Sequence, residues 1–216
     1  MRNLIQFFLK IGEVKLKKQR GLVLRNIKDP ATVGNHSFRE ALMAWVLAKA
    51  EHTGLDENRL IKLVLFHDLV AGYAGDITPY DPLLKKGRGK NLKKMYEKWV
   101  RLSSKEKKQF YAWQKKEEYK ALKRLIANLP SSLKAELTAL WDECKEGSSR
   151  EGRFVQQLDM LENFFQAIEY WKKDKSFSIE SWWQQMKELL NEPLLVQFLG
   201  QVDEYLYKPE LPSSKK

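Results

Sequence analysis

The stretch 56–79, DENRLIKLVLFHDLVAGYAGDITP, decides the fold of this chain. Its apolar residues are spaced so closely that a helix here would be buried on most of its sides. The adjacent pair His67-Asp68 ends the apolar run LIKLVLF, at the inner end of that helix. Because imidazole and carboxylate are common metal ligands, this pair indicates a functional site. Gly72 and Gly75 then interrupt the helical pattern.

The rest of the chain also has helical patterns. Amphipathic spacing predicts helices within residues 1–18, 36–51, 91–129, 132–145, 150–171, 179–190 and 193–206. The region 91–129 is expected to break near residue 103, where Ser103 or Ser104 would cap its second part. No segment alternates as a β-strand would. The sequence therefore predicts an all-α fold, an irregular helical bundle forming a single domain over residues 1–216, with a polar tail at 208–216.

The helix expected at 36–51 has large apolar residues that recur at roughly helical spacing. They are Phe38, Leu42, Trp45 and Val46. This spacing predicts that they form the buried face of the helix. Asn35 is a plausible N-cap for the same helix.

The net charge of +11 is concentrated in one segment of the 216 residues. Residues 85–124 contain 16 Lys or Arg against 4 Asp or Glu, so the remainder is close to neutral. Aromatic residues are interleaved with this charge at Tyr96, Trp99, Phe110, Tyr111 and Trp113. Such a segment could bind nucleic acid by charge neutralisation and base stacking. An amphipathic helical hairpin with its lysines in water is the interpretation that we favour.

The single cysteine and the short apolar runs indicate the environment in which the protein works. Cys144 cannot form an internal disulfide, which fits a reducing cytoplasm. Its position in LTALWDEC indicates a packing residue rather than a nucleophile. The apolar runs fall far short of the roughly 18–20 residues that span a bilayer, so no membrane segment is expected.

Candidate metal ligands are found on three of the expected helices. His36 begins one helix, His67-Asp68 lies on the next, and Asp159 sits at the margin of the apolar face of helix 150–171. His52, in the polar sequence EHTG, fits a surface position better. Two imidazoles and two carboxylates suit a divalent ion such as Mn, Co, Mg, Fe, Ni or Zn, with open positions for water and substrate. The alternative is a pair of helix-capping histidines and a salt-bridged aspartate.

The order His … His-Asp … Asp resembles the signature of the HD-domain metal-dependent phosphohydrolases, especially their YfbR-like 5′-deoxynucleotidase branch. The likeness is carried by residues 22–48, LVLRNIKDPATVGNHSFREALMAWVLA, by 62–79, KLVLFHDLVAGYAGDITP, and by 151–170, EGRFVQQLDMLENFFQAIEY. It covers roughly residues 10–80 and 117–205. Motif order, spacing and flanking residues all agree with the family.

The resemblance implies an HD-domain helical bundle that is a homodimer and that hydrolyses (deoxy)nucleoside 5′-monophosphates to nucleoside and phosphate. It implies that the metal ligands are His36, His67, Asp68 and Asp159. Asp76, in the matching GDI, would be a catalytic or substrate-orienting acid.

Two arginines are candidates for binding the substrate's phosphate. Arg25 and Arg39 could stabilise phosphate charge, and Arg39 lies one helical turn after His36 on the same side. Ordinary salt bridges are the alternative for both.

The sequence departs from the family at positions that matter for catalysis. Ala71 stands where the pattern HDxxE has glutamate, and loss of a general acid or base typically lowers a rate by about 10²–10⁴-fold. Gln156 stands where a lysine is usual. Residues 81–116 have no good counterpart, so we expect a basic, aromatic-containing helical insertion there. Glu117 or Glu118, which follow it, could supply the missing carboxylate.

Three hypotheses about function follow. The leading hypothesis is a metal-dependent phosphohydrolase acting on nucleoside monophosphates. The second is a binding or regulatory protein that keeps the metal and the nucleotide pocket but turns over slowly, because of Ala71. The third is a nucleic-acid-associated protein that works through residues 85–124.

Overall fold

The protein is all-α, as the sequence predicts. A computed structural model describes residues 1–81, 84, 96 and 102–207. Within these residues there are helices and one isolated bridge between Lys18 and Thr32, but no β-strand. The helices are α1 (Arg2–Lys15), α2 (Arg20–Leu24), α3 (Val33–Ala50), α4 (Glu57–Ala74), α7 (Ser104–Leu125), α8 (Ser131–Glu146), α9 (Arg150–Lys173), α10 (Glu180–Leu189) and α11 (Pro193–Tyr207). No helix in this part of the chain combines the length and the hydropathy needed to cross a bilayer.

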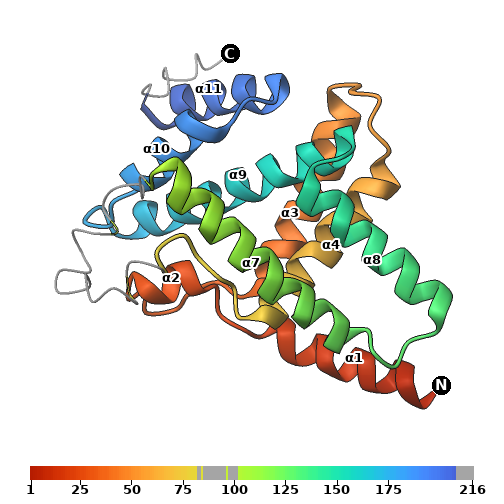
Figure 1. Cartoon of the computed structure of the whole chain (residues 1–216). Coiled ribbons are helices and arrows are strands. Elements are labelled where there is room, and N and C mark those ends of the chain that lie inside the picture. Colours follow the sequence, from red (N-terminus) through yellow and green to blue (C-terminus); the bar gives the residue numbers. More distant parts are fainter. Residues whose placement is uncertain (82–83, 85–95, 97–101, 208–216) are drawn as a thin grey trace, which may run out of the picture.

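Helix α4 is the centre of the molecule. It packs against α1, α3, α7, α8 and α9, and its residues Leu60, Leu63, Val64 and Val70 are fully buried. In Figure 1, α1 and α11 lie at opposite ends of the molecule, and α3, α4 and α9 meet between them. The three helices that carry the candidate ligands are therefore mutual neighbours.

Helix α4 continues for two turns beyond His67-Asp68, so this pair lies in the body of the helix rather than at its end. The expectation that Gly72 interrupts the helix is wrong. A Cβ atom at Gly72 would come within 2.9 Å of Val33 Cγ2 and 3.0 Å of Val14 Cγ1. Glycine is needed here because α1 and α3 approach the backbone closely. The helix ends at Gly75, whose φ of 105° favours glycine.

The buried face of α3 differs from the predicted one. Phe38, Leu42, Trp45 and Val46 are 68%, 41%, 47% and 54% exposed, so this apolar stripe faces outward. The buried positions of α3 are Val33, His36, Glu40, Ala44 and Ala48. Two small alanines allow α3 to lie close to α4, and the two polar residues of this face line up with the candidate site. The prediction failed because both faces of α3 have helical spacing, and the larger apolar residues were assigned to the core.

Helix α3 also begins three residues earlier than predicted. Its N-cap is Thr32, whose Oγ1 accepts a hydrogen bond from the Asn35 N–H at 3.2 Å. The Asn35 side chain in turn accepts one from the Thr32 N–H at 3.0 Å, which completes a capping box. Asn35 is thus part of the cap without being the N-cap residue.

The described part of the basic segment 85–124 is Tyr96 and residues 102–124, which form most of α7. Ser103 caps this helix through a capping box with Glu106, as the sequence predicts. Phe110 is buried while Tyr111 is 51% exposed, and most lysines of the helix are exposed. This arrangement supports an amphipathic helix that packs on the core. Much of the expected insertion (82–83, 85–95 and 97–101) and the tail 208–216 lie outside the described residues.

Candidate metal centre

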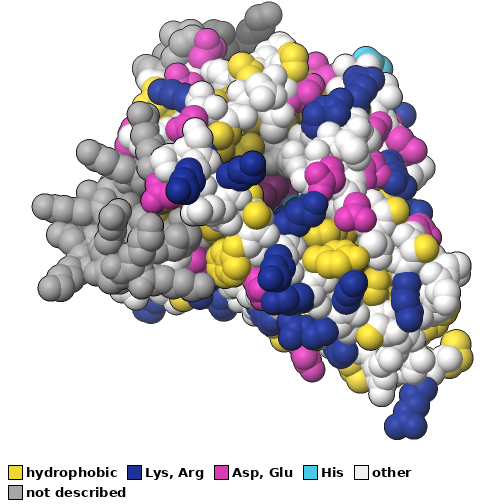
Figure 2. Space-filling view, viewed as in Figure 1, with side chains coloured by type: hydrophobic (Ala, Val, Ile, Leu, Met, Phe, Trp, Pro, Cys, Tyr) yellow, Lys and Arg dark blue, Asp and Glu magenta, His cyan; other side chains and the backbone are white. Residues whose placement is uncertain are grey.

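A cavity of about 610 Å³ opens beside α3, α4 and α9. Its wall includes the predicted site residues Arg25, His36, His67, Asp68, Asp76 and Asp159. On the face shown in Figure 2, the molecule is hollowed near its centre, with acidic side chains deep in the hollow and Lys and Arg side chains around it. The cavity is therefore open to solvent and large enough for a small molecule.

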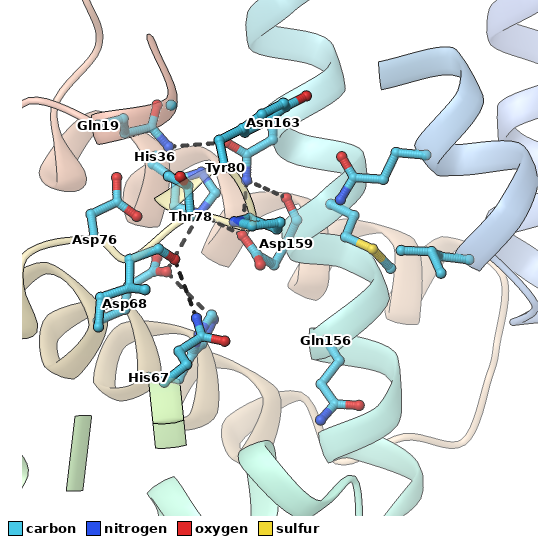
Figure 3. Close-up of a pocket in the computed structure, with 18 of the residues that line it drawn as sticks. Gln19, His36, His67, Asp68, Asp76, Thr78, Tyr80, Gln156, Asp159 and Asn163 are labelled. Carbon is cyan, nitrogen blue, oxygen red and sulfur yellow. Dashed lines mark hydrogen bonds and ion pairs between the residues drawn. The ribbon is translucent and has the colours of Figure 1, made fainter. Parts of the chain in front are cut away.

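Four potential ligand side chains converge at the inner end of this cavity. They are His36, Glu40, Asp68 and Asp159, each with one ligand atom within 4.8 Å of those of the others. His36 Nε2 is 3.0 Å from Asp159 Oδ1, 3.4 Å from Asp68 Oδ1 and 3.5 Å from Glu40 Oε2. Figure 3 shows His36, Asp68 and Asp159 pointing toward one another from three helices. Adjacent ligands of one octahedral ion lie about 3 Å apart, because each bond is about 2.1 Å long, so these atoms could share a divalent cation.

His67 lies at the edge of this group. Its Nε2 is 3.5 Å from Glu40 Oε2 and 3.6 Å from Asp68 Oδ1. The same nitrogen is buried and has no hydrogen-bond partner among the described residues. A ring nitrogen that is left unpaired beside two carboxylates has the environment of a metal ligand. The structure thus brings together all four predicted ligands and adds Glu40 to them.

The helices fix these positions through simple spacing. His36 and Glu40 are four residues apart on α3, so they share one face. Asp68 is held by the Ser37 hydroxyl, which donates to Asp68 Oδ2 at 2.6 Å. Asp159 accepts a hydrogen bond from Asn163 Nδ2 at 3.0 Å, one turn later on α9.

Glu162 and Arg39 form an outer layer behind His36. Glu162 is fully buried, and its Oε2 contacts His36 Nδ1. Its Oε1 accepts a hydrogen bond from Arg39 Nε at 2.8 Å. Such a carboxylate fixes the orientation of a ligating imidazole and turns Nε2 toward the metal.

Arg39 does not line the cavity with the other predicted site residues. Besides Glu162, its guanidinium binds Gln166 Oε1 at 3.0 Å and contacts Glu169. It lies in a second, separate hollow beside α9. The structure therefore supports the salt-bridge alternative for Arg39, because all three nitrogens of its guanidinium contact side chains of the protein.

The charges of the cluster shift the pKa values of its members. Burial lowers the pKa of His36, but the neighbouring carboxylates of Asp68 and Glu162 outweigh it and raise the pKa well above its ordinary value. Burial, together with the charge of Asp68, raises the pKa of Glu40 to about 8. In the metal-free protein, protons thus balance part of the negative charge, and a bound cation would displace them.

Asp76 faces the cluster from the loop after α4. It follows Gly75 with a φ of 52°, a conformation that aspartate tolerates better than most residues. Its Oδ2 accepts a hydrogen bond from the Arg20 N–H at 2.5 Å. Burial raises the pKa of Asp76, and the hydrogen bond from Arg20 opposes this effect. Asp76 thus places a carboxyl group in the cavity wall, beside the candidate ligands.

Arg25 occupies an aromatic part of the cavity wall. Its guanidinium carbon is 4.0 Å from the ring centroid of Trp182 and 5.1 Å from that of Tyr80. It donates hydrogen bonds to Gly21 O at 2.9 Å and to Ser181 Oγ at 3.2 Å. Burial lowers the pKa of Arg25. No carboxylate of the described residues forms an ion pair with it, so its charge is available to an anion in the cavity.

The departures from the family pattern can now be located. Ala71 lines the cavity without a carboxylate. Glu118 lines it too, is 1% exposed, and pairs with Lys145 Nζ at 2.6 Å. Glu117 pairs with Lys120 instead, at 2.8 Å on the outer face. Of the two glutamates considered for the missing carboxylate, only Glu118 lies in the cavity.

The remaining residues singled out in the sequence are not members of the candidate ligand group. Figure 3 shows Gln156 apart from the ligands, and its Nε2 donates to Cys144 O at 2.5 Å. Cys144 is buried and free, as a packing residue would be. His52 is exposed at the end of α3.

Sequence reasoning missed Glu40 and Glu162. A signal for each was present, because Glu40 is four residues after His36 and Glu162 three residues after Asp159. Helical spacing places each pair on one face. Both glutamates were overlooked because only histidines and aspartates were considered as ligands.

Comparison with known proteins agrees with this geometry. The model of the HD domain family matches residues 11–198. The chain is 32% identical over 203 residues to 5′-deoxynucleotidase HDDC2 of Bos taurus, covering 94% of this chain and 85% of the bovine protein. It is 30% identical to the Homo sapiens protein of the same name, with the same coverage.

Solved structures show the same fold at lower identity. A conserved hypothetical protein from Pyrococcus furiosus has a TM-score of 0.65 and 21% identity, over 94% of this chain and 98% of its own. A Pyrococcus horikoshii protein has a TM-score of 0.65 and 20% identity, over 92% and 97%. With its helical fold and its ordered His36, His67-Asp68 and Asp159, the chain belongs to the HD-domain family.

Proposed function

We propose that the protein is a metal-dependent phosphohydrolase that releases phosphate from (deoxy)nucleoside 5′-monophosphates. HD domains bind divalent metals, and the relatives reported above are named 5′-deoxynucleotidases. The observation that carries the proposal is the convergence of His36, Asp68 and Asp159 at the inner end of an open cavity. With His67, these are the residues that we propose to hold the ion.

A divalent ion bound there would lower the pKa of a water to make it a nucleophile, and it would polarise a phosphoryl oxygen. Asp76 would orient that water or accept its proton, because its carboxylate faces the cluster from the cavity wall. Arg25 would bind the negative charge of the substrate. The aromatic rings of Tyr80 and Trp182, which also line the cavity, offer surfaces on which a base can stack.

The test is release of inorganic phosphate from a panel of deoxynucleoside and nucleoside 5′-monophosphates, with Mn²⁺ or Co²⁺ present. We expect release by the wild-type protein and its loss in Asp68→Asn. No release from any substrate by folded, metal-loaded protein would overturn hydrolysis. Calorimetric binding of a nucleotide without hydrolysis would then favour the regulatory alternative, which Ala71 in the cavity wall suggests.

We further propose that two copies associate through the outward stripe of α3, formed by Phe38, Leu42, Trp45 and Val46. Four large apolar side chains at 41–68% exposure on one helix face are unusual for a free surface. A two-fold axis would pair each stripe with its copy, burying both. The resemblance to a homodimeric family favours this partner over others.

Light scattering coupled to size-exclusion chromatography tests the association. We expect a dimer for the wild type and a monomer for Trp45→Glu with an unchanged helical circular dichroism spectrum. Tyr205→Glu, at a residue 69% exposed on α11, is the matched control and should remain a dimer. A monomeric wild type at all concentrations would overturn the proposal.

The domain organisation and the compartment remain proposals of the same kind. We propose a single HD domain over the whole chain, with 81–116 as an insertion, because one apolar core draws on residues from α2 to α11. We propose a cytoplasmic location because the only cysteine, Cys144, is a buried free thiol that a reducing compartment preserves.

A further inference from the structure

Glu40 is a buried carboxylate without hydrogen-bond partners. Its exposure is 0%, and neither of its oxygens accepts a hydrogen bond from any described residue. Burying a carboxylate in this state costs several kcal/mol unless a cation compensates it. The charge of this carboxylate must therefore be balanced, by a proton in the metal-free protein or by a bound cation.

The position of Glu40 shows where such a cation would lie. Its Oε2 is 3.5 Å from His36 Nε2 and 3.5 Å from His67 Nε2. These separations are too long for good hydrogen bonds but fit neighbouring ligands of one ion. The same carboxylate belongs to the group within 4.8 Å that includes Asp68 and Asp159.

Glu40 approaches the cluster from the side away from the cavity. His36, His67, Asp68 and Asp159 all line the cavity, whereas Glu40 is absent from its wall. A substrate in the cavity would reach the other ligands before it reached Glu40. This position argues against direct proton transfer from Glu40 to a substrate and leaves two roles for the carboxylate, ligation of the metal or charge balance for the imidazoles.

We propose that Glu40 is a fifth ligand of the metal and closes the inner side of the site; this inference rests on the proposed metal centre. The donor set then becomes two imidazoles and three carboxylates. Water and substrate would reach such an ion from the cavity, which four of these five residues line. A third carboxylate also favours oxygen-preferring ions such as Mn²⁺ over zinc. In this proposal, Glu40 on α3 supplies a carboxylate to the metal site, whereas Ala71 on α4 supplies none.

The alternative is that Glu40 serves only as a counter-charge to the imidazoles. Both interpretations predict a change in stability when Glu40 is altered, so stability alone cannot separate them. Metal affinity can, because only a ligand loses a bond to the ion. Glu118→Gln is the control, since it removes another buried carboxylate, one that lines the cavity and pairs with Lys145 but lies outside the ligand group.

The experiment is titration of the metal-free full-length protein with Mn²⁺, followed by electron paramagnetic resonance of the free ion. We expect one ion per chain in the wild type, with affinity at least tenfold weaker in Glu40→Gln and little changed in Glu118→Gln. Glu40→Leu, which cannot ligate, should weaken it further. Circular dichroism checks that each variant is folded. If a Glu40 variant does not fold, Glu40→Asp takes its place. Because its side chain is shorter, we expect Glu40→Asp to bind Mn²⁺ more weakly than the wild type.

The outcomes separate this inference from the proposed function. If the wild type binds no Mn²⁺, the metal centre itself is overturned. If the wild type binds one ion and Glu40→Gln binds it equally well, only the ligand role of Glu40 is overturned. An equal loss in Glu40→Gln and Glu118→Gln would show a general charge effect and would likewise overturn direct ligation.

Discussion

At the scale of the residue, Asp76 combines a left-handed backbone conformation with the proposed role of proton acceptor. Its φ of 52° is one that asparagine also adopts readily, so Asp76→Asn should leave the loop intact. We expect kcat for phosphate release to fall by about 10²–10⁴-fold, because the amide cannot accept a proton. Mn²⁺ affinity should stay within about threefold, since Asp76 is not one of the proposed ligands. A kcat close to that of the wild type would remove Asp76 from the mechanism.

Arg39 provides a second test at this scale, because positioning and substrate binding have different kinetic signatures. Arg39 holds Glu162, which holds His36. In Arg39→Met we expect metal affinity to fall by about 10–100-fold, as for other outer-layer residues. KM for the nucleotide should be unchanged at saturating metal, and Arg39→Lys should recover part of the affinity. A raised KM with unchanged metal affinity would instead assign Arg39 to substrate binding.

The residues of the site were only partly predictable from the sequence. The order of the motifs alone was enough to propose His36, His67, Asp68 and Asp159 as a group, without knowledge of the fold. The spacing of Glu40 from His36 was a signal too, but the choice of the wrong buried face for α3 hid its importance. The choice between Thr32 and Asn35 as N-cap likewise depends on the backbone conformation at Thr32, which either residue type can adopt.

At the scale of the element, the close contact of α4 with α1 and α3 depends on Gly72. Gly72→Ala would place a methyl group 2.9 Å from Val33 Cγ2 and 3.0 Å from Val14 Cγ1. We expect a loss of about 1–3 kcal/mol in the free energy of unfolding, measured by urea denaturation. Gly200→Ala on α11 is the control, because nothing lies within 4 Å of the added atom. The control should gain up to about 1 kcal/mol from helix propensity, and equal effects in both variants would contradict the packing argument.

The loop after α4 is held by Asp81, which gives a prediction about pH. Asp81 accepts hydrogen bonds from Arg20 Nη2 at 2.6 Å and from the Thr78 N–H at 2.8 Å. Burial alone would raise the pKa of Asp81, but these partners outweigh it and lower the pKa below its ordinary value of 3.8. Because the folded pKa is the lower one, the stabilisation is present above about pH 4 and is lost as the pH falls through the folded pKa.

The corresponding experiment compares the wild type with Asp81→Asn by denaturant unfolding at several pH values. We expect Asp81→Asn to be less stable near pH 6, by about 1–3 kcal/mol. The difference should shrink as the pH falls below 4. A difference that stays constant down to pH 3 would show that the charge of Asp81 is not what stabilises the loop.

The predicted helices agree with the observed ones where a single face is apolar. In α9, for example, Phe154, Val155, Leu158 and Leu161 are buried and form the apolar face at whose margin the sequence places Asp159. Helix α3 has two competing stripes, and sequence spacing cannot tell a core from an exposed apolar surface. Small residues at helix crossings are equally hard to interpret from sequence. Gly72 is predicted to break the helix unless the close neighbours that require a glycine there are known.

At the scale of the whole molecule, the metal should act as a stabiliser. Three carboxylates and two imidazoles meet at the inner end of the cavity, where protons balance only part of the negative charge in the metal-free protein. Mn²⁺ at about 100 times its Kd should add about 2.7 kcal/mol to the free energy of unfolding, and EDTA should reverse this. Thermal melting measures the change. An identical melting temperature with EDTA and with excess Mn²⁺ would mean that the cluster binds no ion in the folded state.

The distribution of the ligands along the chain has a consequence for how the molecule folds. Helices α3 and α4 are consecutive, and they carry all the proposed ligands except Asp159, which follows about 90 residues later on α9. Closing so long a loop is entropically costly, and contacts of this range form slowly. The α3–α4 hairpin can assemble locally, whereas the complete ligand set exists only after α9 has docked. Capture of the ion would therefore follow the docking of α9 and would hold this helix against the α3–α4 hairpin.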